Sequence, residues 1–190
     1  MSLQLSLKQM LQLTSEEATL AATFFKERQL AKQTILMQQN TTCQSLYFLA
    51  SGYIRVYTNH DGKEITQWIC TPDYLVTDLG AWLFGKQTKW NFETLSDTIV
   101  YEIKIKDYNT LRHQISNWPD KERHFIGHCF EQMEQRIYNF IALNSEERYM
   151  HFMTYFGYLF NEVPHQYIAS IIGITPETLS RLRKKISEKK

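Results

Sequence analysis

The hydrophobic pattern of this chain changes twice, near residue 29 and near residue 106. From about residue 29 to 105, apolar residues fall in short β-branched and aromatic runs, such as Tyr53–Tyr57, Glu64–Ile69 and Thr98–Ile103. The segment from Asn59 to Gly62 joins two of these runs and is typical of a hairpin turn, because Asp-Gly tolerates positive φ angles. Six or more short strands separated by turns predict an all-β sandwich or barrel.

Helical patterns surround this β-rich part. Thr14 and Glu17 form a capping-box pattern that predicts an early helix, and the segment 77–84 favours a short helix among the strands. Pro119 suits the first turn of a long helix that runs to about Leu143. The next helix is expected to begin after Asn144.

The composition excludes several classes of protein. The three cysteines, Cys43, Cys70 and Cys129, lie far apart, which argues against a disulfide framework and favours a reducing compartment. No apolar run approaches the length of a membrane span, and the first residues lack the pattern of a signal peptide. We therefore expect a cytoplasmic protein with no membrane partner.

Positive charge gathers at one end of the chain. Residues 175–190 carry six Lys and Arg against two Glu, although the whole chain of 190 residues has a net charge of +1. Such a local excess is expected of a phosphate-binding surface, and a solvated basic tail is the alternative.

The predicted long helix carries an apolar seam. Its apolar residues recur at alternating spacings of four and three, which is a heptad pattern and predicts a dimerisation face. A helix that packs onto its own domain is the alternative. The predicted dimerisation residues are Ile126, Phe130, Met133, Ile137 and Phe140.

The segment from Val163 to Ile186 carries the most information. Pro164 can open a helix, Gly173 can stop it, and Thr175 can cap a second helix. Small and apolar residues at the spacing Ala169, Gly173, Leu179 and Leu182 are typical of a helix-turn-helix, and an ordinary helical hairpin is the alternative. The residues expected to face DNA are Thr175, Glu177, Thr178, Ser180, Arg181, Lys184 and Lys185.

This segment resembles the C-terminal helix-turn-helix of the Crp/Fnr family of bacterial transcription regulators, especially the short-winged kind common in Bacteroidetes. The stretches 49–56 and 61–64 are similar to that family's cyclic nucleotide-binding jelly roll. The resemblance covers nearly the whole chain. It implies an α+β fold with an N-terminal antiparallel β jelly roll, a long dimerisation helix and a C-terminal helix-turn-helix domain. The corresponding divisions are residues 1–118, 119–143 and 144–190.

The resemblance also implies an effector site in a short helical segment, residues 74–91, which we call the cassette. In the family, a Glu and an Arg hold the ribose and the cyclic phosphate. Asp78 stands at the position of the Glu, and Thr88-Lys89 replaces the Arg-Ser pair. Lys cannot form the bidentate fork of an arginine, so cyclic AMP is not expected to bind well, and the alternatives are another small-molecule effector or no effector. The predicted effector residues are Asp78, Leu79, Gly80, Lys89 and Trp90.

On the second helix of the motif, Glu177 and Arg181 match base-contacting positions of the family, and Pro176 replaces a family Arg. Only residues 161–163 precede Pro164 after the previous helix, so the β-hairpin wing has no room. The cysteine cluster of the oxygen-sensing members is absent, and we expect no iron–sulfur centre or other cofactor. The implied partners are double-stranded DNA with a palindromic operator, a second copy of the chain and, as a candidate, RNA polymerase.

Two other classes of function compete with a transcription regulator. The first is a small-molecule-binding adaptor that no longer binds DNA, which has no need of the outward Arg181, Lys184 and Lys185. The second is a metal-dependent enzyme on a jelly roll, for which His124 and His128 could share a metal on one helix face. No third ligand lies within sequence reach, and no nucleophile-and-base motif is present, so no catalytic or metal-binding residue is predicted.

Overall fold

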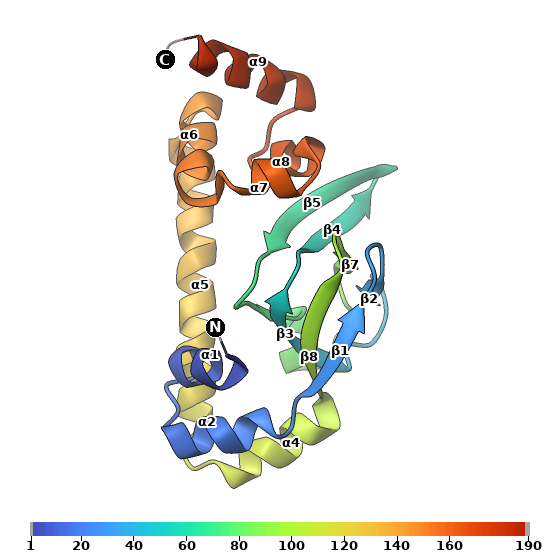
Figure 1. The fold of residues 1–190 in the computed structure, drawn as a ribbon, viewed down its shortest axis with the longest axis vertical. Coiled ribbons are helices and arrows are strands. Elements are labelled where there is room, and N and C mark those ends of the chain that lie inside the picture. The colour runs from blue at the N-terminus through green and yellow to red at the C-terminus, as the bar shows by residue number, and fades with distance from the viewer. Residues whose placement is uncertain (1, 189–190) are drawn as a thin grey trace.

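The computed structural model describes residues 2–188 and arranges them along one long helix, α5. Figure 1 shows two β-sheets beside α5, with α1, α2 and α4 at one of its ends and α6 to α9 at the other. The helices are α1 (Leu3–Met10), α2 (Ser15–Ala22), α3 (Leu79–Phe84), α4 (Ile105–Gln114), α5 (Trp118–Ala142), α6 (Ser145–Phe156), α7 (Leu159–Glu162), α8 (His165–Ile171) and α9 (Pro176–Ser187).

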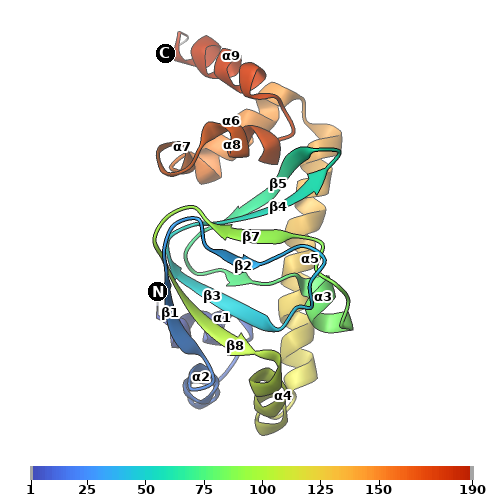
Figure 2. The same cartoon turned by 90° about the vertical axis from the view of Figure 1, so that its right-hand side faces the viewer.

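The β-rich part forms two antiparallel four-stranded sheets, with strand orders β1-β8-β3-β6 and β2-β7-β4-β5. The two sheets face each other in Figure 2, which is the arrangement of a jelly roll. The predicted antiparallel jelly roll and the long helix after it are therefore confirmed. The strands are β1 (Lys26–Leu30), β2 (Ile35–Met37), β3 (Ser45–Ser51), β4 (Ile54–His60), β5 (Lys63–Cys70), β6 (Leu75–Val76), β7 (Asn91–Thr94) and β8 (Thr98–Lys104).

Local signals in the sequence explain where several elements begin and end. The hairpin between β4 and β5 pairs His60 with Lys63 and leaves Asp61 and Gly62 at φ angles of 49° and 76°, as Asp-Gly predicts. Asn144 caps α6 by accepting from the backbone N–H of Glu147 at 3.1 Å, while the Glu147 carboxylate accepts from the Asn144 N–H at 2.8 Å.

The first hydrophobic core joins the jelly roll to the helices at the N-terminal end of α5, the lower end in Figure 1. Trp118, the first residue of α5, is 1% exposed, and its indole N–H donates to the Tyr108 hydroxyl at 3.2 Å. The predicted capping box of Thr14 and Glu17 begins α2, and the Glu17 carboxylate also pairs with Lys121 of α5 at 2.9 Å. This core therefore fixes the lower part of α5 against the sheets.

A second core lies at the C-terminal end of α5, the upper end in Figure 1. It is shared by the predicted effector domain, residues 1–118, and the predicted DNA-binding domain, residues 144–190. Ile69 of β5 is 1% exposed and belongs to the same cluster as Phe152 of α6 and Ile168 of α8. The Trp68 ring meets the Phe156 ring edge-on, with centroids 5.2 Å apart. Strand β5 therefore supplies part of the core on which the last four helices rest.

This shared core yields a prediction about stability. Ile69→Ala should lower the free energy of unfolding by about 2–5 kcal/mol, because it removes buried methyl and methylene groups between β5 and α8. Ile65→Ala, on the same strand but 42% exposed, should change it by no more than about 0.5 kcal/mol. Urea unfolding of both variants measures the difference, and equal losses would contradict a core shared by β5 and α8.

Candidate functional site

A cavity of about 630 Å³ lies between the second sheet and α5 and is roofed by α6 and α8. This volume is within the range of small-molecule sites in proteins, about 300–1,000 Å³. Most of its wall is apolar and aromatic. The lining residues are Val56, Gln67, Trp68, Cys70, Tyr74, Leu75, Thr77, Asp78, Leu79, Gly80, Trp90, Phe92, Phe125, Cys129, Gln132, Met133, Gln135, Arg136, Asn139, Phe140, Arg148, His151, Phe152, Phe156, Ile171 and Ile172.

Four of the five predicted effector residues line this cavity. Asp78 caps α3 by accepting from the Ala81 N–H at 3.1 Å, and its second oxygen accepts from the Lys89 N–H at 2.7 Å. Leu79, Gly80 and Trp90 also form part of the wall. The fifth residue, Lys89, does not line the cavity, and its side chain is exposed to solvent. Its backbone N–H, and not its ammonium group, donates to Asp78.

Two arginines that sequence reasoning did not select reach the cavity from the helices. Arg148 is held by carbonyl oxygens: its Nε donates to Ile172 O at 2.9 Å and its Nη1 to Leu143 O at 2.7 Å. Arg136 makes one longer hydrogen bond, from Nη2 to Ile171 O at 3.4 Å. No local sequence pattern identifies Arg136, because the groups around its guanidinium come from β5 and from the end of α8.

The cavity also contains two thiols. Burial raises the pKa of the Cys70 thiol to about 12 and raises that of Cys129 as well. Both thiols are therefore protonated at neutral pH, and protonated thiols are poor nucleophiles and poor metal ligands.

The histidines weighed as metal ligands are engaged elsewhere. His124 Nε2 lies 2.8 Å from the Gln12 side-chain amide, and His128 Nε2 lies 2.8 Å from that of Gln132. Within residues 2–188, no three His, Cys, Asp or Glu side chains are grouped closely enough to hold a metal ion.

The second region of interest is the pair of helices α8 and α9. Gly173 ends α8 with φ at 68°, and Thr175 begins α9 by accepting from the Thr178 N–H at 3.2 Å. Leu179 is 1% exposed and packs with Ile168 and Ala169 of α8. The inner face of α9 is thus held against α8, and its outer face remains in solvent.

The outer face of α9 carries the residues expected to contact DNA. Thr175, Glu177, Ser180, Arg181, Lys184 and Lys185 are exposed, and Thr178 is half-buried. A hydrogen bond from the Thr175 hydroxyl lowers the pKa of Glu177, so this carboxylate stays ionised. Lys185 pairs with Glu146 of α6 at 2.5 Å, which joins the two helices.

The third region is the apolar face of α5. Phe130, Met133 and Ile137 are 65%, 52% and 55% exposed, unusually high for such side chains. Ile126 is half-buried and lines a small gap beside Trp118. Phe140 is 40% exposed, and its ring lies against Gly173 of the same chain, where a Cβ would come within 2.5 Å of it.

Comparison with protein families matches residues 27–114 to the cyclic nucleotide-binding domain. This match covers β1 to α4, which includes the strands and the cassette that border the cavity. A comparison with curated protein sequences finds no match. The jelly roll is therefore similar to a cyclic nucleotide-binding domain.

Solved structures extend the similarity beyond the jelly roll, and those of Crp/Fnr-type regulators are among them. The catabolite activator protein of Thermus thermophilus is 21% identical, with a TM-score of 0.61 over 97% of this chain and 87% of that one. FixK2 from Bradyrhizobium japonicum is 15% identical, with a TM-score of 0.74 over 87% of this chain and 85% of that one. The c-di-GMP-responsive global regulator CLP of Xanthomonas campestris is 15% identical, with a TM-score of 0.67 over 93% of each chain. At these identities, the similarity establishes a common fold.

Within residues 2–188, no helix is both long enough and apolar enough to cross a membrane.

The hydrogen bonds of Asp78 predict different losses of stability for two substitutions at this position. Asp78→Ala removes the acceptor of two backbone N–H groups and should lower the free energy of unfolding by about 1–3 kcal/mol. Asp78→Asn keeps one carbonyl oxygen and should lose less. Urea unfolding of the two variants gives the order, and amide hydrogen exchange at Ala81 and Lys89 should rise in Asp78→Ala. Unchanged exchange at both amides would contradict this role of Asp78.

Proposed function

We propose that this protein is a dimeric, sequence-specific DNA-binding transcription regulator whose jelly-roll cavity takes a small-molecule effector. The observation that carries the proposal is the arrangement of α8 and α9. A tight turn at Gly173 joins them, α8 holds the apolar side of α9, and the exposed side of α9 presents Glu177 and Arg181. A helix presented in this way fits the major groove of DNA.

The exposed side of α9 divides by chemistry into two kinds of contact. Arg181 can donate two hydrogen bonds to the O6 and N7 of a guanine, and Glu177 can accept one from a cytosine amino group. Thr175, Thr178 and Ser180 supply hydroxyls for backbone phosphates near the start of the helix. Lys184 and Lys185 lie further along, and Lys185 would exchange Glu146 for a phosphate on binding.

The α5 face supports the dimer. Phe130, Met133 and Ile137 expose apolar surface along one side of the helix, and a second copy would bury it in a symmetric contact. In this proposal residues 1–118 are the effector domain, whose cavity is closed by α5, α6 and α8, residues 119–143 dimerise and residues 144–190 bind DNA. A two-fold dimer suits a palindromic operator with half-sites about 34 Å apart. RNA polymerase is a candidate further partner, and the cytoplasm is the proposed compartment.

The first functional prediction concerns base reading. Arg181→Ala should weaken binding to the preferred site by about 1–3 kcal/mol and relax the choice of base at one position per half-site. Lys184→Ala should weaken binding to all sequences alike and reduce the salt slope by about one. Lys106→Ala, on α4 at the opposite end of the molecule, is the control and should change neither (Figure 1).

Titrations at two salt concentrations on a selected site and on a scrambled duplex measure these effects. An unchanged ratio of specific to scrambled affinity in Arg181→Ala would exclude base reading by this residue. A wild-type protein without any salt-dependent DNA binding would favour the adaptor function instead.

The second functional prediction concerns the dimer. Ile137→Asp places an unpaired charge in the apolar face of α5 and should convert the dimer to a monomer. His128→Asp introduces the same residue on the same helix away from that face, and this variant should stay dimeric. Analytical ultracentrifugation separates the two cases. A dimeric Ile137→Asp protein would place the contact elsewhere.

A further inference from the structure

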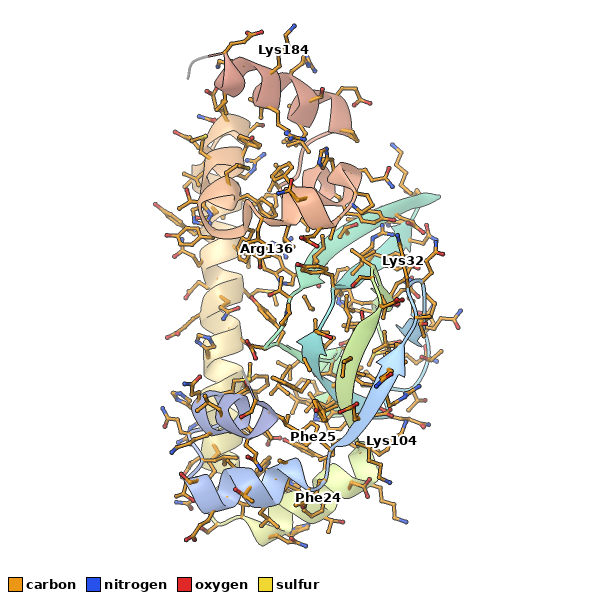
Figure 3. The ribbon with its side chains drawn as sticks, viewed as in Figure 1. Phe24, Phe25, Lys32, Lys104, Arg136 and Lys184 are labelled. Atoms are coloured by element: carbon orange, nitrogen blue, oxygen red, sulfur yellow. The ribbon has the colours of Figure 1, made fainter. Side chains whose placement is uncertain are left out.

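Arg136 is a partly desolvated cation in the wall of the cavity. Its guanidinium lies between α5 and β5 (Figure 3), 5.2 Å from the centre of the Trp68 ring and 5.8 Å from that of Phe140. Burial lowers the pKa of this guanidinium, because desolvation disfavours the charged form. Among residues 2–188 it forms no ion pair. Its side chain is half-buried, and a guanidinium removed from much of its water ordinarily has such a partner.

Arg136 also has hydrogen-bonding capacity to spare. A guanidinium carries five N–H donors, and the structure engages one of them, with Ile171 O at 3.4 Å. Within the described residues, every fully buried side-chain nitrogen and oxygen has a partner, so the remaining nitrogens of Arg136 are not fully buried. Because Arg136 is part of the cavity wall, a ligand in the cavity can reach these donors. Arg148 differs, because two carbonyl oxygens within 2.9 Å hold its guanidinium.

Charge along the cavity defines which end attracts an anion. Within the described part of the chain, Arg136 and Arg148 are the cationic side chains of the wall, and Asp78 is its one carboxylate. Asp78 begins α3, and Leu79 of α3 adjoins Phe125 in a second, smaller gap. Phe125 precedes Arg136 by three helical turns, about 16 Å along α5. The cassette end therefore repels an anion, and the Arg136 end attracts it.

Most of the remaining wall is aromatic and aliphatic. Trp68, Trp90, Phe92 and Phe156 are among its members. We infer that the cavity binds an amphiphilic organic anion, with its carboxylate or phosphate on Arg136 and its apolar body toward the jelly roll. The inference rests on the proposed function, which assigns the effector to this cavity, and names the chemical class of that effector.

The position of Arg136 gives such a ligand a path to α9. Ile171, whose carbonyl accepts from Arg136, is the last residue of α8, and Gly173 and Thr175 follow directly before α9. An anion on the remaining donors would draw the guanidinium toward the cavity and so change its long hydrogen bond to that carbonyl. Occupancy of the cavity is thereby coupled to the end of α8 from which α9 is oriented.

The experiment compares three ligands that share a ten-carbon tail: decanoate, decyl phosphate and the neutral decanol. Trp68 and Trp90 line the cavity, so tryptophan fluorescence reports occupancy, and calorimetry gives Kd for the full-length protein without DNA. At least one of the two anions should bind wild type about tenfold to a hundredfold more tightly than decanol, as expected of hydrogen bonds to a charged group. The decanoate and decyl phosphate arms distinguish a carboxylate from a phosphate ligand.

Arg136→Gln should abolish the preference for the anion and leave the affinity for decanol unchanged. Arg123→Gln, an exposed position on the same helix and outside the cavity, is the matched control and should behave as wild type. Three results would overturn the inference: neither anion binds, decanol binds as tightly as both anions, or the anions bind Arg136→Gln as tightly as wild type. Cyclic AMP binding that is tight and insensitive to Arg136→Gln would also overturn it, because the cassette would then hold the phosphate.

The comparison of anion with alcohol in wild type requires no variant, so it stands if Arg136→Gln fails to fold. A second titration of operator DNA, with and without the anion, should show an affinity change in wild type that Arg136→Gln lacks. Loss of all DNA binding would contradict the proposed function and leave the ligand titration unaffected.

Discussion

The open edge of strand β5 is the constraint on which the upper half of the molecule depends. β5 is the last strand of its sheet, and an edge strand has backbone groups without a strand partner. Ser170 of α8 meets this need: its hydroxyl accepts from the Thr66 N–H at 2.9 Å and donates to Thr66 O at 3.3 Å. Since one side chain serves both groups, α8 is fixed in position and orientation on the sheet.

A charged cluster beside this contact strengthens the same junction. Arg55 is 2% exposed, its guanidinium lies 3.8 Å from the centre of the Tyr167 ring of α8, and it pairs with Glu64 of β5 at 2.7 Å. These contacts therefore hold α8, which closes one side of the cavity, in a fixed position on the second sheet. The same contacts that set the cavity roof set the direction of α9, so a ligand and a DNA site would share a single structural element.

Local chemistry made much of this fold predictable, and long-range contacts limited the rest. Turns and helix caps could be predicted because positive φ angles and capping hydrogen bonds depend on residues adjacent in the sequence. Examples are Gly173, Thr175 and the Asp61-Gly62 turn. β1, with the sequence KERQL, has no apolar alternation because it is a solvated edge strand, so it escaped prediction. The cassette could be located by resemblance, whereas Arg136 could not, since its surroundings come from β5 and α8, far away in the sequence.

The second core has a consequence for biosynthesis. Trp68 and Ile69 leave the ribosome with β5, long before Phe152 and Ile168 are made. During that interval an unpaired strand edge and an apolar surface stand together, which is the combination that promotes association between nascent chains. The helices that would contact DNA thus also bury the exposed edge of the jelly roll, late in synthesis. A chain truncated before these helices would therefore expose an aggregation-prone strand edge.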